Sequence, residues 1–313
     1  APLLESCGSF NVASINNYSI NLVNMNLPKL EKCNGNFTIK FFGGEVIDLP
    51  SLKSVKSKID FTNIQFVERI NTPVLSECGE IALSALLSVA ELDFSKCPLS
   101  PKVAISNCPA LKKLGLPKEI TDVLKFTGNA KQTFFPQLFG VEKVGSSVQA
   151  SSFNCDVNLG SIKDAAYITM PFANNVTGLE MPNLETVKTI NVGNAGKMTV
   201  FKAPKLKECT TFMFKGGVLV EDLDFSSLEK VDAFTYYGAT SAAKAKDCIL
   251  TNMNTFSNLK TAKKIDVRYC GNLADFSGFK NVIGSLSGNS NWTVMGCAYN
   301  PTLQDMIDGK YTE

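Results

Sequence analysis

The sequence predicts a β-rich solenoid: an irregular leucine-rich repeat, similar to a right-handed β-helix, with about 22 residues and two short strands per coil and few helices. Three observations predict this class. A leucine recurs every 22 residues at Leu184, Leu206 and Leu228. Apolar residues alternate over short runs on both sides of each leucine, which indicates half-buried strands. No segment sustains the 3.6-residue period of an amphipathic helix over three turns.

The repeat is clearest between residues 179 and 236. Each copy starts at a corner with proline or serine, continues with an inward leucine and a valine or cysteine, and ends with two alternating apolar residues. Proline suits the corner because the end of a strand needs no ladder donor. The three copies contain Pro182, Leu184, Val187, Ile190 and Val192, then Pro204, Leu206, Cys209, Phe212 and Phe214, then Ser226, Leu228, Val231, Phe234 and Tyr236.

The same pattern continues less regularly towards both ends of the chain. An earlier copy holds Pro50, Leu52, Val55, Ile59 and Phe61. Repeats that stack share one continuous core, so we expect a single solenoid domain over residues 1–313 with roughly twelve coils. The pattern is irregular at residues 121–165 and 239–256. The polar residues of a C-terminal cap, at about 277–313, are expected to close the core.

The ten cysteines follow the repeat. Cys33, Cys78 and Cys209 take the position that valine holds in other copies, and Cys108 and Cys270 share a second position just after a strand. Small thiols pack well in apolar interiors. The sequence therefore predicts mostly free, buried cysteines and no disulfide framework.

Composition excludes several classes of function. The 31 Lys and Arg are spread evenly among 29 Asp and Glu, for a net charge of +2, so we expect no nucleic-acid partner. There is no run of about 20 apolar residues that could span a membrane. The chain has no histidine and no CxxC, so we expect neither a metal site nor a Ser-His or Cys-His catalytic site, and no cofactor.

Two stretches resemble known repeat families. The segment NCPALKKLGLPKEITDV, residues 107–123, resembles the leucine-rich repeat of BspA-like surface proteins. The segments IDLPSLKSVKSKIDF at 47–61 and LEMPNLETVKTINV at 179–192 are similar to the receptor L-domain repeat. Both families are right-handed β-rich solenoids.

The resemblance implies a secreted or surface-anchored protein of Bacteroides-type bacteria. Such a protein is commonly a lipoprotein of the outer membrane, and here the lipid anchor would lie upstream of residue 1. It would act by adhesion to a protein or glycan ligand at the cell surface and would carry no catalytic residues. The resemblance transfers no site residue to this chain. We also expect a monomer.

Outward positions on the strands are the candidate binding residues. The first strand of successive coils presents Asp48, Asp93, Glu180, Lys202 and Asp224. In stacked coils these positions lie about 4.8 Å apart, so the acids could form a negative stripe. The second strand presents Lys215, Tyr237, Asp266 and Arg268, and Tyr and Arg are favoured at interfaces. Both rows also fit an ordinary solvated β face whose charges discourage aggregation.

The favoured function is a non-catalytic binding or adhesion module, and two alternatives stay open. One is a carbohydrate-active β-helix enzyme using carboxylates. Asp222 and Asp224 would face the same way on a strand, about 7 Å apart, a separation found in inverting glycosidases. The other is a structural spacer without a specific ligand.

Overall fold

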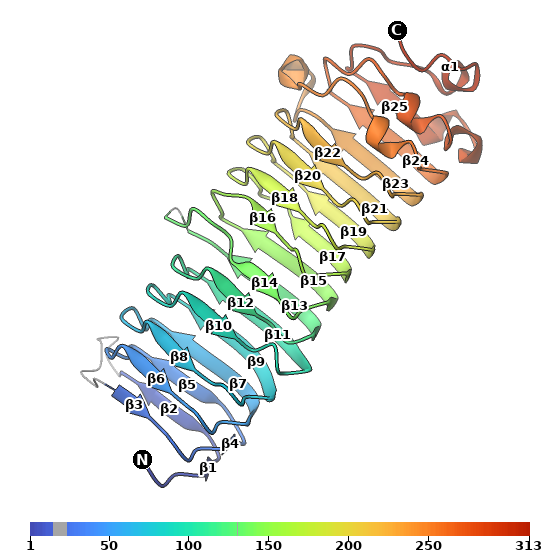
Figure 1. Cartoon of the computed structure of the whole chain (residues 1–313). Coiled ribbons are helices and arrows are strands. Elements are labelled where there is room, and N and C mark those ends of the chain that lie inside the picture. Colours follow the sequence, from blue (N-terminus) through green and yellow to red (C-terminus); the bar gives the residue numbers. More distant parts are fainter. Residues whose placement is uncertain (15–23, 130) are drawn as a thin grey trace. The chain divides into compact units, whose positions relative to one another are not determined.

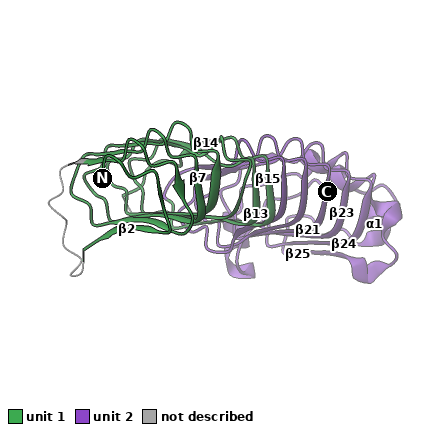
Figure 2. Cartoon of the chain, turned by 90° about the horizontal axis from the view of Figure 1, so that it is seen from below, with its two compact units in different colours: residues 1–153 green, residues 154–313 purple. Residues whose placement is uncertain are grey.

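A computed structural model of the chain describes residues 1–14, 24–129 and 131–313. The fold is a parallel β-solenoid of about ten coils, with roughly 22 residues per turn and few helices (Figure 1), which confirms the predicted class. The chain divides into two compact units, residues 1–153 and 154–313 (Figure 2), each with its own strands. The expected single domain stays a prediction.

Unit 1 contains one long parallel sheet and two short ones. The long sheet consists of β1 (Ser6–Cys7), β2 (Phe10–Ala13), β4 (Lys32–Cys33), β5 (Phe37–Lys40), β7 (Ser54–Thr62), β9 (Glu77–Ser84), β11 (Leu99–Ser106), β13 (Glu119–Thr127) and β15 (Lys143–Ser151). The short sheets consist of β3 (Asn24–Asn26), β6 (Val46–Asp48) and β8 (Arg69–Asn71), and of β10 (Glu91–Asp93), β12 (Lys113–Gly115) and β14 (Gln137–Phe139).

Unit 2 repeats this plan with one long and one short sheet. The long sheet consists of β17 (Asp164–Met170), β19 (Thr186–Val192), β21 (Glu208–Lys215), β23 (Lys230–Tyr237), β24 (Thr261–Arg268) and β25 (Trp292–Met295). The short sheet consists of β16 (Val157–Asn158), β18 (Gly178–Glu180), β20 (Val200–Lys202) and β22 (Asp222–Asp224).

Helical segments are short and lie towards the C-terminus of unit 2. Among the described residues the only α-helix is α1 (Leu303–Ile307). Five 3₁₀ turns accompany it: η1 (Ala242–Asp247), η2 (Asn254–Phe256), η3 (Ser277–Phe279), η4 (Ile283–Ser285) and η5 (Asn289–Asn291). The region 277–313 that the sequence predicts as a cap thus contains three of these turns, β25 and α1.

The prolines of the repeat form tight turns at the corners. The N–H of Leu184 donates to the carbonyl of Met181 over 3.2 Å, which places Pro182 second in a four-residue turn. Proline favours this position because its ring fixes φ close to the value that the turn requires there. Leu184 itself is 1 % exposed, so the turn directs the leucine inward as predicted.

The repeat position shared by Cys33, Cys78 and Cys209 lies within strands of the long sheets. In the early coils β4 and β5 are separate, and both pair with the single strand β7. Cys209 likewise lies in β21, next to Val187 and Val231 in the neighbouring strands. Cys33, Cys78, Cys108, Cys209 and Cys270 are all at most 5 % exposed. The prediction that these cysteines are buried is therefore confirmed.

The structure has about ten coils where roughly twelve were expected, and two coils of unit 2 are longer than the repeat. Ile168, Ile190, Phe212 and Phe234 are register partners at the regular spacing of the repeat. The next partner along the chain is Ile265, and the step to it is longer because η1 and η2 are inserted between the strands. The following step, from Ile265 to Trp292, also exceeds the regular spacing and contains η3, η4 and η5.

Candidate binding surface

The structure distributes the five predicted residues of the short strands over three separate sheets. Asp48 is on β6 and Asp93 on β10, in two different short sheets of unit 1. The Asp48 carboxylate accepts a 2.7 Å hydrogen bond from the side chain of Asn71, and Asp93 accepts one of 2.8 Å from the backbone of Ser95. These two acids are therefore not neighbours in one stripe.

In unit 2 the predicted row does come together, with a cation at its centre. Glu180, Lys202 and Asp224 are register partners across β18, β20 and β22. Lys202 forms an ion pair with Asp222, and this hydrogen bond, with the nearby acids, raises the pKa of Lys202. The row is of mixed charge, so it is not the negative stripe considered from the sequence.

The carboxylate pair of β22 is held by partners within the chain. Asp222 is paired with Lys202, and a carboxylate oxygen of Asp224 accepts the backbone N–H of Ser226 over 3.0 Å. The second contact is the Asp-stabilised turn that commonly follows a strand.

The two predicted residues of the long sheet, Tyr237 and Arg268, lie side by side. They are register partners on β23 and β24, and Lys215 is the partner of Tyr237 on β21. The residue before each of the three, namely Phe214, Tyr236 or Val267, is fully buried. Because side chains alternate along a strand, those of Lys215, Tyr237 and Arg268 point outward. With Asp266 and Tyr269 they form a group that we call the Tyr237 cluster.

Asp266 holds the Tyr237 cluster together. Its side chain is only 7 % exposed. One carboxylate oxygen accepts from Nε of Arg268 at 2.6 Å, and the other accepts from Nη2 of Arg268 at 2.9 Å and from the Tyr237 hydroxyl at 3.1 Å. A bidentate pair of this kind fixes the plane of the guanidinium. The ring and the guanidinium are therefore preorganised on the sheet surface.

Two cations flank the ring of Tyr237. The Lys215 ammonium lies 4.8 Å from the ring centroid and the Arg268 guanidinium 5.3 Å from it, both within range of cation–π attraction. Tyr269 contacts the same ring edge-on at 6.0 Å. Hydrogen bonding to Asp266 raises the pKa of Arg268, while burial and Asp266 raise the pKa of Tyr237. The phenol is therefore a neutral donor at physiological pH.

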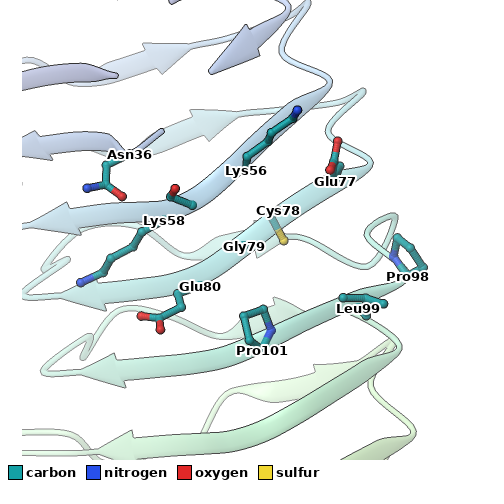
Figure 3. Close-up of a pocket in the computed structure, with 11 residues that line it drawn as sticks. Asn36, Lys56, Lys58, Glu77, Cys78, Gly79, Glu80, Pro98, Leu99 and Pro101 are labelled. Atoms are coloured by element: carbon teal, nitrogen blue, oxygen red, sulfur yellow. The ribbon is translucent and has the colours of Figure 1, made fainter. Parts of the chain in front are cut away.

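A second feature, which the sequence did not indicate, is a hollow of about 710 Å³ in unit 1 (Figure 3). Lys56, Lys58, Glu77 and Glu80 supply charges of both signs around it, and an apolar edge is supplied by Pro98, Leu99 and Pro101. Its volume is in the range of small-molecule sites. The mixture of charges does not select one class of ligand.

The hollow lies where the long strands are irregular. The register between β7 and β9 shifts between Val55 and Lys58. There the backbone of Ser57 approaches Gly79 so closely that a Cβ at residue 79 would overlap the Ser57 carbonyl. The buried hydroxyl of Ser100 donates to the Gly79 carbonyl over 2.6 Å. A glycine inside a strand pattern is the sequence signal that could have indicated this bulge.

Asp93 lines a smaller hollow of about 220 Å³ in unit 1, together with Asn71, Lys96 and Phe139. Register partners Asp93, Gly115 and Phe139 lie on adjacent strands, and a Cβ at Gly115 would overlap both neighbouring side chains.

Across the described ranges, no helix has the length and apolarity to cross a membrane. Within the same ranges, no three His, Cys, Asp or Glu side chains are placed to hold a metal ion.

Comparison with known proteins gives no relative. No protein-family model, no curated protein and no solved structure matches this chain.

Proposed function

We propose that this protein is a non-catalytic binding or adhesion module that recognises a protein or glycan partner through the Tyr237 cluster. The observation that supports this is an aromatic ring flanked by two cations and fixed by Asp266 on the outward face of a parallel sheet. A partner that meets fixed side chains loses less entropy on binding than one that must order them. Tyr and Arg are also the side chains that most often dominate binding energy.

The charges of the cluster favour a partner that carries carboxylate or sulfate groups. Lys215 and Arg268 carry two positive charges against the single carboxylate of Asp266. Nε and Nη2 of Arg268 are bonded to Asp266, so Nη1 can still donate to a ligand. Within the part of the chain that the structure describes, Lys215 forms no ion pair. An anionic group above the Tyr237 ring would therefore meet donors from both cations.

The place of action in this proposal is a bacterial cell surface, with an outer-membrane lipid anchor upstream of residue 1. Its support is the resemblance of residues 107–123 and 179–192 to surface-protein repeats. A sheet that binds through its outward face suits a surface module, because stacked coils offer an extended row of side chains to a partner.

The test is binding of the purified chain to an array of neutral, uronate-containing and sulfated glycans and to immobilised extracellular-matrix proteins. We expect Tyr237→Ala and Lys215→Ala each to weaken binding roughly tenfold, the loss typical of an interface centre. Matched controls are Tyr167→Ala, an exposed tyrosine on β17 of the same unit, and Lys125→Ala on β13 of unit 1. Both controls should bind like the natural chain.

Three outcomes would count against the proposal. Equal loss in Tyr167→Ala and Tyr237→Ala would place the interface elsewhere on the sheet. No binding to any glycan or protein would favour a structural spacer. Release of sugars from an arrayed glycan, abolished by Asp222→Ala or Asp224→Ala, would instead favour the carbohydrate-active enzyme.

A further inference from the structure

Three cysteines of unit 2 lie close together: Cys270 and Cys297 just after their strands, and Cys248 just after η1. Cys270 lies two residues beyond Arg268 and Cys297 two residues beyond Met295. Arg268 and Met295 are register partners on β24 and β25, so the two cysteines take equivalent positions in adjacent coils. The local geometry agrees, because each thiol contacts the carbonyl two residues earlier, at 3.4 Å for Cys270 and 3.9 Å for Cys297.

Cys248, which precedes β24 in the chain, also lies close to Cys270. It follows η1, and its carbonyl accepts a 2.8 Å hydrogen bond from the side chain of Asn272. A Cβ at Gly238 would overlap the Cys248 sulfur and lie 2.8 Å from the Cys270 sulfur, so both sulfurs face the same point. The neighbouring thiols of Cys248 and Cys297 raise the pKa of the Cys270 thiol. Cys270 is therefore the central member of the group.

The spacing suits a covalent bond between coils. Equivalent positions of adjacent parallel strands are about 4.8 Å apart, and disulfides join Cα atoms about 4.4–6.8 Å apart. We propose that Cys248, Cys270 and Cys297 are a disulfide site in which Cys270 is the obligate partner and bonds to one neighbour at a time. The bond ties the coil of β24 to an adjacent coil at the C-terminal end of unit 2.

Oxidation starts at Cys297. This residue is 9 % exposed, whereas Cys248 and Cys270 have no exposed surface. Donation from Cys270 lowers the pKa of Cys297, which favours its thiolate. The oxidant is a small-molecule disulfide such as oxidised glutathione. The Cys297 thiolate attacks one of its sulfurs, and one glutathione leaves as the thiolate.

The second step closes the bond within the protein. The Cys270 sulfur attacks the Cys297 sulfur of the mixed disulfide, and the second glutathione leaves as a thiol with the proton that Cys270 gives up. Two cysteine thiols have then lost two electrons and two protons, and one glutathione disulfide has become two glutathione thiols. Cys248 can next attack Cys270 and release Cys297 as a thiol, which moves the disulfide inward without further oxidant.

The experiment equilibrates the full reduced chain with reduced and oxidised glutathione, blocks free thiols with iodoacetamide and maps peptides by mass spectrometry. We expect one disulfide in the group, Cys270 to Cys297 or Cys270 to Cys248, and an oxidised chain that unfolds several degrees higher than the reduced one. Cys248→Ala should retain the bond between Cys270 and Cys297. Cys270→Ala should abolish both bonds.

Cys209→Ala serves as the matched control, since Cys209 is buried in the same unit and its sulfur contacts backbone carbonyls. This variant should form the same disulfide as the natural chain. Three alkylated thiols at 248, 270 and 297 after equilibration would overturn the proposal. A bond between Cys248 and Cys297, or a bond that forms only in urea, would overturn it as well.

Discussion

The hydroxyl of Tyr237 lies 3.1 Å from a carboxylate oxygen of Asp266, and the two residues are 29 positions apart in the chain. Arg268 binds the same carboxylate through two nitrogens. A buried carboxylate with three donors is costly to remove, because Arg268 and the Tyr237 hydroxyl both lose the charged partner that fixes them. Asp266 therefore contributes to stability as well as to the shape of the candidate binding surface.

Asp266→Ala is expected to lower the free energy of unfolding by about 2 kcal/mol, as measured by urea denaturation. The control is Asp232→Ala, which breaks the ion pair between Lys263 and Asp232. That pair is at the surface, with the lysine side chain 77 % exposed, so its loss should cost less than about 1 kcal/mol. Equal costs for the two variants would show that Asp266 does not anchor the cluster.

The position of Cys209 in β21 predicts which side chains the long strand accepts. Val187 and Val231 take this position in the two neighbouring coils. Cys209→Val should therefore change stability by less than about 1 kcal/mol, since it exchanges one small apolar group for another. Cys209→Ser removes the apolar sulfur, although its hydroxyl can still donate to the Thr211 carbonyl that the thiol contacts, and should cost about 1–2 kcal/mol in urea denaturation. A valine variant less stable than the serine variant would refute this view of the position.

Leu184, Leu206 and Cys209 could be assigned to the core from the sequence, because their burial depends only on a local period. The pairing of Tyr237 with Arg268 could not be predicted from the sequence. One regular step of the repeat from Tyr237 leads to Leu259, which is fully buried, whereas the true partner Arg268 lies further along the chain. The length of the insertion that holds η1 and η2 decides this register, and no periodic signal encodes it.

The hollow of unit 1 was hidden for a related reason. Its charged residues Lys58 and Glu80 look like ordinary outward positions of a strand. What brings them to the edge of a hollow is the shift of register between β7 and β9 beside Gly79. Gly79 inside the strand pattern indicates a bulge, but the hollow beside it depends on how the two backbones pair, which the sequence of either strand does not give.

Gly79 gives a direct test of that bulge. A Cβ at this position would overlap the carbonyl of Ser57, which belongs to the backbone and cannot rotate away. Gly79→Ala should therefore destabilise the chain by about 1–3 kcal/mol in urea denaturation, the usual cost of overpacking. Gly8→Ala is the control, since no atom lies within 4 Å of the position that its Cβ would take. If Gly79→Ala left the free energy of unfolding unchanged, β7 and β9 would be able to move apart at this position at little cost.

The stability of the C-terminal helix α1 should depend on pH through a single carboxylate, that of Asp305. Asp305 accepts the hydroxyl of Thr302 at 2.6 Å and its backbone N–H at 3.0 Å, while the Thr302 hydroxyl oxygen accepts the N–H of Asp305. This reciprocal cap and the ammonium of Lys310 lower the pKa of Asp305 from 3.8 to about 2. Because the folded value is the lower one, the contribution to stability is complete above pH 3.8 and is lost as pH falls towards 2.

Trp292 can follow this transition, since it is the one tryptophan of the chain and its indole N–H donates to the carbonyl of Pro301, next to the cap. We expect its fluorescence to change between about pH 4 and pH 2 as the cap opens. Asp305→Asn should remove this acid step, because the amide does not titrate. Asp308→Asn, which changes the C-cap residue of α1 and leaves the reciprocal bonds between Thr302 and Asp305 intact, should retain it. An unchanged step in Asp305→Asn would assign the transition to another group.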